Sequence, residues 1–166
     1  FSSENLFKDS KWLADGKLRL GFGNAGNNRI ASSAFADTMI GGLGNDTFAF
    51  ASELTTLDTV VGGEGTDELT ATPAAGTARP TVSGVEKIQL DFGTASASVN
   101  LGSVTGATTL NLSGDEAHTV SSIPASIATV NLASTDANGG ETVTLTYNSA
   151  VTSAVTVTIG DVVDGT

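Results

Sequence analysis

A nine-residue repeat runs through the first half of the chain and constrains its fold more than any other feature. Asp46 lies nine residues after Asp37 and eighteen after Asn28, and an apolar residue stands two places after each of the three. The repeat is kept in five units, which are GNAGNNRIA (23–31), SSAFADTMI (32–40), GGLGNDTFA (41–49), ELTTLDTVV (53–61) and GGEGTDELT (62–70). Because the polar and the apolar positions share one period, residues 23–70 are predicted to form a repeat structure.

Each unit predicts a six-residue turn followed by a three-residue strand. Alternate residues of a strand face opposite sides, so one apolar side chain per unit is expected to point inward. The expected inward residues are Ile30, Met39, Phe48, Val60 and Leu69. Two units form one coil, so the turns of alternate units stack along the same edge. This places Asn28, Asp46 and Asp67 at one edge, and Asp37 and Asp58 at the other.

The units GGLGNDTFA and GGEGTDELT resemble the calcium-binding nonapeptides of RTX proteins, whose pattern is GGxGxDxUx. The resemblance implies an all-β fold: a parallel β-roll or β-solenoid with Ca²⁺ between stacked turns. It also implies a ligand set. One unit supplies the carbonyls of positions two and four and its sixth-position Asp. The unit one coil later supplies the carbonyls of positions one and three and its own Asp. Calcium takes six to eight oxygen ligands of these kinds.

Carried over to this chain, the resemblance implies one complete site and two weaker ones. The complete site uses Gly42, Gly44 and Asp46 together with Gly62, Glu64 and Asp67. A second site uses Asn24, Gly26 and Asn28 together with Gly41, Leu43 and Asp46, and is weaker because an Asn replaces an Asp. A third ion would need Asp37 and Asp58, whose turns lack the glycines. The alternative for every one of these turns is an Asx-turn, in which the side chain caps backbone N–H groups without a metal.

The second half of the chain has a looser pattern. Residues 71–84 are rich in Pro, Ala, Gly and Thr, and are predicted to be a connection. Short runs that alternate apolar residues with Thr or Asn follow: VEKIQL (85–90), SVNL (98–101), TLNL (109–112), TVNL (129–132), TVTL (142–145) and TVTI (156–159). Residues 85–166 are therefore predicted to form a solenoid or a sandwich. The solenoid is favoured, because Thr and Asn ladders suit parallel stacking. The whole arrangement resembles the β-solenoid region of RTX-type bacterial surface-layer proteins.

The first 22 residues differ from the repeats and are predicted to cap the roll. LFKDSKWLADGKLRLGF (6–22) contains Asp15-Gly16 between apolar residues, which favours a hairpin. Its apolar side chains would cover the open end of the roll, since an open end exposes unpaired strand edges. The alternative is that residues 1–22 contact another subunit.

Composition excludes several classes of function. The chain has no cysteine, which excludes disulfides and thiolate metal sites. Its net charge is −11 and no Lys or Arg follows Lys87, which argues against nucleic acid and favours divalent cations. No apolar run is long enough for membrane insertion. HExxH, GxSxG and nucleotide-binding glycine motifs do not occur, and the lone His118 is expected on a solvated loop, so no enzyme is expected.

Two functions agree with these features. The first is an extracellular, calcium-stabilised structural protein that self-assembles into a surface layer or filament at the bacterial surface. Its expected partners are other copies of the chain and, additionally, a cell-surface polysaccharide. The second is an RTX repeat module of a larger secreted adhesin, toxin or enzyme, acting in type I export and in folding. Self-assembly of the isolated chain would favour the first function.

Overall fold

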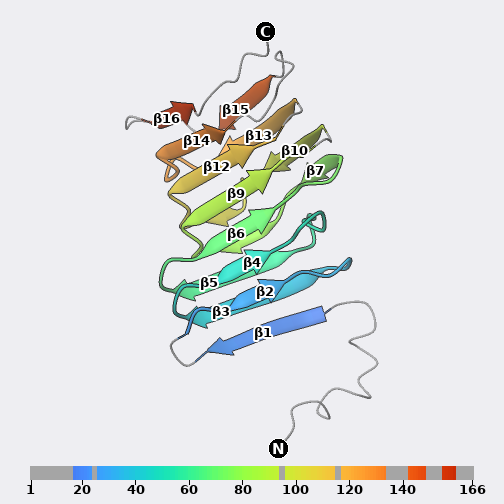
Figure 1. Ribbon diagram of the computed structural model, residues 1–166, viewed down its shortest axis with the longest axis vertical. Helices are drawn as coiled ribbons and strands as arrows, with labels where there is room; N and C mark the ends of the chain where they lie inside the picture. Colours follow the sequence, from blue (N-terminus) through green and yellow to red (C-terminus); the bar gives the residue numbers. More distant parts are fainter. Residues whose placement is uncertain are drawn as a thin grey trace, which may run out of the picture.

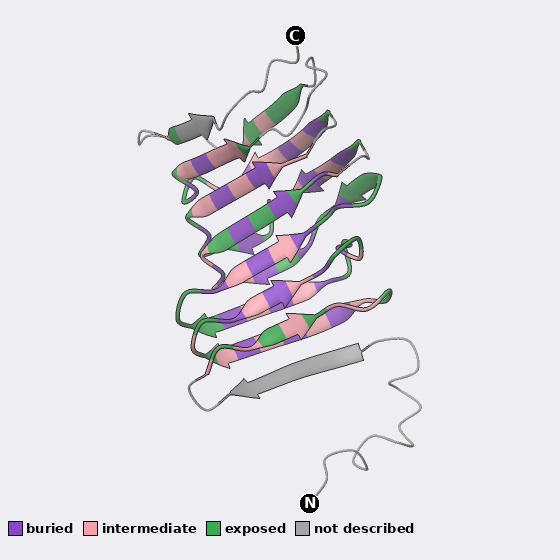
Figure 2. Cartoon of the chain, viewed as in Figure 1, coloured by how far each residue is buried: buried purple, intermediate pink, exposed green. Residues whose placement is uncertain are grey.

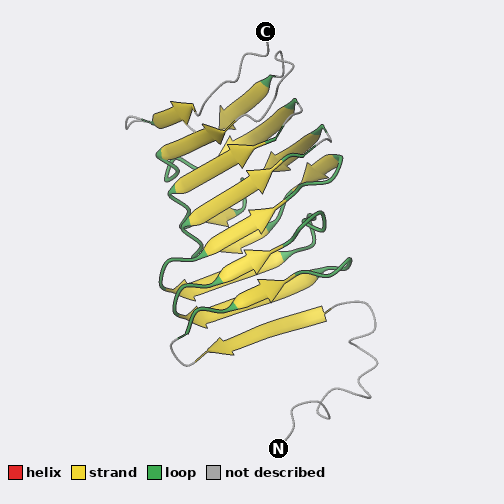
Figure 3. Cartoon of the chain, viewed as in Figure 1, coloured by secondary structure: helices red, strands yellow, loops and turns green. Residues whose placement is uncertain are grey.

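The computed structural model describes residues 17–23, 26–93, 96–114, 117–133, 142–148 and 155–159; for 17–23 and 157–159 it describes the backbone alone. This part of the chain is all-β, with strands joined by turns and loops (Figure 3). The strands stack in sequence order along the long axis of the molecule, each coil lying on the one before it (Figure 1). No helix that could cross a membrane occurs in the described part. The predicted fold class, a parallel β-solenoid, is confirmed.

The described strands form three sheets, in which every strand pair is parallel. Sheet A contains β1 (Lys17–Gly23), β3 (Asp37–Leu43), β5 (Thr59–Glu64), β8 (Thr81–Ser83) and β11 (Val104–Thr105). Sheet B contains β2 (Arg29–Ala31), β4 (Thr47–Ala49), β6 (Glu68–Ala71), β9 (Lys87–Asp91), β12 (Thr109–Ser113), β14 (Thr129–Ala133) and β16 (Thr156–Ile159). Sheet C contains β7 (Gly76–Ala78), β10 (Ala97–Asn100), β13 (His118–Ile123) and β15 (Val143–Tyr147).

The register between coils follows the apolar positions of the sequence. In sheet B one column of paired residues runs through six strands, namely Ile30, Phe48, Leu69, Ile88, Leu110 and Val130. Successive members are separated by 18, 21, 19, 22 and 20 residues, so coil length varies while the inward column is kept. The insertions therefore lie in the turns, since a one-residue shift within a strand would turn its apolar face outward.

The outline of the coil changes along the axis. From β2 to β6 the chain alternates between sheets B and A, which gives the two strands per coil expected for a β-roll. From β6 to β11 it passes through sheets B, C and A in turn, so each coil has three sides. The third side begins in residues 71–84, predicted as a connection, because this segment contains β7 and β8. Beyond β12 the coils alternate between sheets B and C.

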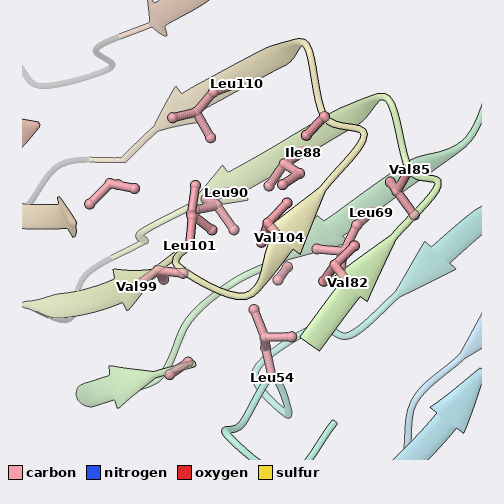
Figure 4. Packing of buried hydrophobic residues seen from close by; sticks show 14 of the residues in the cluster. Leu54, Leu69, Val82, Val85, Ile88, Leu90, Val99, Leu101, Val104 and Leu110 are labelled. Carbon is pink, nitrogen blue, oxygen red and sulfur yellow. The ribbon is translucent and has the colours of Figure 1, made fainter. Parts of the chain in front are cut away.

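The core fills the space between the sheets and is apolar. Met39, Phe48 and Val60 are fully buried and Leu69 is nearly so, which confirms their predicted inward direction; Ile30 packs against the same cluster while partly exposed. Buried and more exposed residues alternate along the strands (Figure 2). In the second half, side chains from all three sheets meet in the interior (Figure 4). Burial of this apolar surface is the main source of stability.

Two further expectations, for the N-terminal segment and for His118, have different outcomes. The predicted hairpin at Asp15-Gly16 and the side chains of the predicted cap lie outside the described residues; the backbone of β1 forms the end strand of sheet A and pairs with β3. The expectation for His118 was wrong. It begins β13, is 5% exposed, and its ring stacks on Phe92 with centroids 3.9 Å apart and planes 8° apart. His118 thus occupies an inward-facing position of its strand. The acidic residues before it in the sequence had suggested a solvated loop instead.

Candidate metal centre

Two glycine-rich turns, 41–46 and 62–67, stack at the edge where sheet A leads into sheet B. We call this edge the glycine edge. The glycines at positions two and four of both turns have left-handed backbone angles: φ is 107° at Gly42, 106° at Gly44, 116° at Gly63 and 134° at Gly65. Residues with a Cβ rarely adopt these angles. The two turns therefore have the same conformation, as the repeat predicted.

The coils approach so closely at the glycine edge that no Cβ fits between them. A Cβ on Gly63 would meet the carbonyl oxygen of Gly42, and a Cβ on Gly65 would meet that of Gly44. The carbonyl groups of Gly42 and Gly44 therefore face the next coil. These are two of the backbone ligands that the resemblance implied. Glycine is required here by the close approach as well as by the backbone angle.

Acidic side chains form a ladder along the same edge, each bonded to the coil below. Asp46 Oδ1 accepts a hydrogen bond of 2.8 Å from the Asn28 N–H, and Asp67 Oδ1 accepts one of 2.7 Å from the Asp46 N–H. Glu86 Oε2 accepts one of 2.7 Å from the Asp67 N–H. We call this series the acid ladder. These contacts cap backbone N–H groups of the neighbouring coil rather than of the same turn, and they occupy one oxygen of each aspartate.

The second carboxylate oxygen of Asp46 and of Asp67 takes no part in these caps. Asp46 and Asp67 are 1% and 0% exposed, and the Oδ2 atom of each is buried without a hydrogen-bond partner. A buried carboxylate oxygen left without a partner costs about 1–3 kcal/mol or more, so native structures pair such atoms or bind a cation. These two atoms are therefore the places where the edge requires a positive ligand.

The surroundings of Asp46 Oδ2 fit a calcium ion. A Cβ on Gly41 would meet both this oxygen and the carbonyl oxygen of Gly62, so the two oxygens converge on the space that glycine leaves open. With the carbonyls facing the next coil, the ion would be held by the predicted set of Gly42, Gly44, Asp46, Gly62, Glu64 and Asp67. The Glu64 carbonyl already accepts a 2.9 Å bond from the Gly44 N–H and would contribute its second lone pair. When bound, the ion supplies charge neutralisation and links two coils.

Backbone groups dominate this ligand set. In the described part of the chain, no three Asp, Glu, His or Cys side chains gather with the spacing of a metal site. A site made mostly of carbonyl oxygens suits a hard cation such as calcium and does not suit zinc, which takes nitrogen and sulfur ligands. The chemistry of the donors thus agrees with the predicted ion.

The charges of the acid ladder act on its middle member. Burial raises the pKa of Asp67 above 3.8, and the neighbouring charges of Asp46 and Glu86 raise it further, while the hydrogen bond from the Asp46 N–H lowers it. Neither burial nor like charges favour the ionised form of Asp67. A divalent cation beside this carboxylate would offset both effects.

The second predicted site is described only in part. Asn24 lies outside the described residues. The Gly26 carbonyl faces Gly44 and also accepts a 3.1 Å bond from the Asn28 side-chain amide, while the Leu43 carbonyl accepts a 3.3 Å bond from the Gly26 N–H. An ion at this position stays a prediction.

At the opposite edge, Asp37 and Asp58 are engaged by hydrogen bonds. Asp37 Oδ2 accepts a 2.6 Å bond from the Ser33 N–H, and the Ser33 hydroxyl donates to the same carboxylate. Asp58 Oδ2 accepts from the Thr55 N–H and hydroxyl, and its Oδ1 accepts a 2.8 Å bond from the Asp37 N–H. Caps of this kind account for both residues without a metal, and their role as ligands stays a prediction.

Glu86 belongs to the acid ladder but was not among the predicted site residues. The signal that marks it is present in the sequence, because Glu86 stands two places before the inward Ile88, as Asp46 stands before Phe48. It was missed because the turn before it, 84–86, has half the length of the nonapeptide turn. Between the paired positions Val61/Ser83 and Glu68/Lys87, six residues in one coil correspond to three in the next.

Comparison with known proteins agrees with this geometry. The family model described as RTX calcium-binding nonapeptide repeat (4 copies) matches residues 22–52, which include the turn 41–46. Searches of curated proteins and of solved structures found no match. Residues 22–52 are therefore similar in sequence to the RTX calcium-binding nonapeptide repeat, a repeat that binds calcium in secreted proteins.

Proposed function

We propose that this chain is an extracellular structural protein whose β-roll folds when calcium enters the glycine edge. One observation carries the proposal: Asp46 Oδ2 and Asp67 Oδ2 are buried, without a hydrogen-bond partner, between glycine-rich turns. A fold that buries these oxygens is incomplete without a cation. The proposed role is mechanical, and it requires no catalytic group.

The short strands of the roll explain why the ion would control folding. β2 and β4 have three residues each, so they bury little apolar surface for the backbone entropy they lose. Without an ion, the ladder carboxylates repel one another; with it, the binding free energy becomes folding free energy. Extracellular calcium sites have dissociation constants of about 10⁻⁴ to 10⁻³ M. Such a site stays empty in the cytosol and fills outside the cell, which suits export of an unfolded chain.

Circular dichroism of the full chain during a calcium titration tests this proposal. Strand signal from the roll is expected to appear with calcium and to disappear with a chelator. Magnesium at the same concentration is the control, because it prefers near-ideal octahedral geometry and keeps its waters. A spectrum that neither calcium nor chelator changes would overturn the proposal.

The end strands of the described sheets favour a second step, self-assembly into a surface layer or filament. β16 and β2 are end strands of sheet B, and a parallel end strand leaves backbone groups able to pair with another copy. The net charge of −11 opposes contact between copies unless a cation neutralises it. Calcium bridging of acidic flanks would provide that neutralisation, with a cell-surface polysaccharide as a further proposed partner.

Light scattering and electron microscopy in calcium, magnesium or sodium at matched ionic strength test the assembly step. Large assemblies are expected in calcium alone, since general screening would respond to any of the salts. A chain that folds in millimolar calcium but stays monomeric at high concentration would contradict assembly. It would favour the other candidate, a folding and export module of a larger secreted protein.

A further inference from the structure

The acid ladder continues beyond the nonapeptide repeats, to the point where the roll passes into the second half of the chain. We propose that a further calcium ion binds there, between the turns 62–67 and 84–86. Its ligands would include Asp67 Oδ2, the carbonyl oxygen of Gly84 and the Glu86 carboxylate. The inference rests on the proposed calcium-dependent fold and adds a site formed with a turn that is not a nonapeptide. Both turns lie outside the residues that the family model matches.

The first argument is the unpartnered oxygen of Asp67. Its Oδ1 accepts the hydrogen bond from the Asp46 N–H, whereas its Oδ2 is buried without a hydrogen-bond partner. A Cβ on Gly62 would meet both Asp67 Oδ2 and the Gly84 carbonyl oxygen. The same relation holds one coil below, where a Cβ on Gly41 would meet Asp46 Oδ2 and the Gly62 carbonyl oxygen. The local geometry of the predicted calcium site is thus repeated at the junction.

The second argument is that Gly84 continues the glycine column of the roll. Gly84 has φ of 60°, and its Cβ position lies 3.3 Å from the Gly63 nitrogen and 3.6 Å from the Gly63 carbonyl oxygen. Gly63 lies still closer to the coil below it, since a Cβ on Gly63 would meet the Gly42 carbonyl oxygen. Gly84 therefore packs against the turn glycines of the coil below and places its carbonyl as Gly62 places its own one coil earlier, although only three residues form its turn.

The third argument is the carboxylate that completes the pair. Glu86 Oε2 caps the Asp67 N–H at 2.7 Å, as Asp67 Oδ1 caps the Asp46 N–H at the same distance. Its side chain is one methylene longer than that of aspartate and extends from the shorter turn. Val85 and Ile88, on either side of it in the sequence, are buried and hold the segment in the core (Figure 4). Glu86 is thus fixed at the ladder position.

The ladder ends one coil later, so the proposed ion would be the last of the column. The Glu86 carbonyl accepts a 3.0 Å hydrogen bond from the Thr108 N–H, and the Thr108 hydroxyl lies 3.4 Å from the same oxygen. Thr108 stands two places before Leu110, as Asn28 stands two places before Ile30, and neither side chain is charged. Asp46, Asp67 and Glu86 therefore form a carboxylate column between neutral ends. An ion on each side of Asp67 would separate its charge from both neighbours.

The Glu86→Gln variant tests the proposal, with calcium counted by equilibrium dialysis of the full chain in millimolar calcium. The Gln side-chain oxygen can still accept the bond from the Asp67 N–H, so the cap is kept while the charge is lost. Glu86→Gln is expected to bind one ion fewer than the unaltered chain. Asp91→Asn is the matched control, because Asp91 is an exposed acid at the end of β9, the strand that begins directly after Glu86, and its loss should leave the count unchanged.

The possible results separate this proposal from the proposed function. An unchanged count in Glu86→Gln, together with a lower count in Asp46→Asn, would overturn the junction site and leave the calcium-dependent roll intact. An unaltered chain that binds no calcium would overturn both. Hydrogen exchange of the unaltered chain gives a second measurement in case Glu86→Gln does not fold. Calcium should protect residues 84–90, and no protection there in a chain whose 41–46 turn is protected would also overturn the site.

Discussion

Replacing Gly41 by alanine probes the proposed calcium site without requiring a change in the backbone angles of residue 41. Gly41 is buried in β3, and it is not among the glycines with left-handed φ, so alanine can adopt its conformation. The added methyl would lie 2.5 Å from the Gly62 carbonyl oxygen and would overlap Asp46 Oδ2. One of these is a backbone atom that cannot easily move. Gly41→Ala should therefore displace the Asp46 carboxylate from the space in which the ion is proposed to bind.

Two contributions set the size of the effect. A displaced Asp46 no longer accepts the hydrogen bond from the Asn28 N–H, and leaving that donor without a partner costs about 1–3 kcal/mol. Loss of the ion adds to this. With a dissociation constant of about 10⁻⁴ to 10⁻³ M, free calcium at about 10 mM stabilises one site by about 1.4–2.7 kcal/mol. Gly41→Ala is thus expected to lower the free energy of unfolding in calcium by about 2–6 kcal/mol.

Urea unfolding at several calcium concentrations separates the two contributions. The free energy of unfolding rises with the logarithm of calcium concentration, with a slope set by the number of ions bound on folding. Gly41→Ala should reduce that slope by the equivalent of one ion. Gly76→Ala is the control: its φ of 117° makes alanine strained, but nothing lies within 4 Å of the added Cβ. Gly76→Ala should destabilise the chain with an unchanged slope, and a wild-type slope in Gly41→Ala would refute the reasoning.

Three further outcomes are expected. Asp46→Ala should remove more bound calcium than Asp37→Ala, because Asp46 has a buried oxygen without a partner and Asp37 is capped by Ser33; equal losses in calorimetric titrations would show that the edges are wrongly assigned. The pKa of Asp67 is raised in the folded chain, so the folded state holds its proton to higher pH than the unfolded state, and the calcium-free chain should lose stability as pH rises above 3.8. Circular dichroism in chelator should therefore show more strand signal just above pH 3.8 than at about pH 7.5, and Asp67→Asn should reduce this difference. Phe48→Ala should cost about 3–5 kcal/mol because the ring is fully buried, whereas Phe35→Ala, at a ring that is 59% exposed, should change the urea midpoint little.

The features that the sequence predicted correctly are those that one unit encodes locally. The nine-residue period placed Asp46 and Asp67 at one edge, because an equal number of turns and strands separates them. The alternation around Phe48 predicted its inward direction, since strand geometry alone determines which residues share a face. The glycines of the turn 41–46 predicted a backbone that only glycine adopts readily. None of these inferences required knowledge of the neighbouring coil.

Other features of the protein could be recognised only from the tertiary structure, because they depend on which residues meet when coils of unequal length stack. Glu86 joins the acid ladder 19 residues after Asp67, and its turn is three residues shorter than the turn 62–67. No repeat period in the sequence predicts that Glu86 and Asp67 are equivalent. The hydrogen bonds that Ser33 donates to Asp37 likewise depend on how one non-repeating turn folds. His118 is buried because its strand brings it against Phe92 from the preceding coil. Local pattern determines the direction of a side chain, but its partners depend on the register between coils, which packing of the whole core selects.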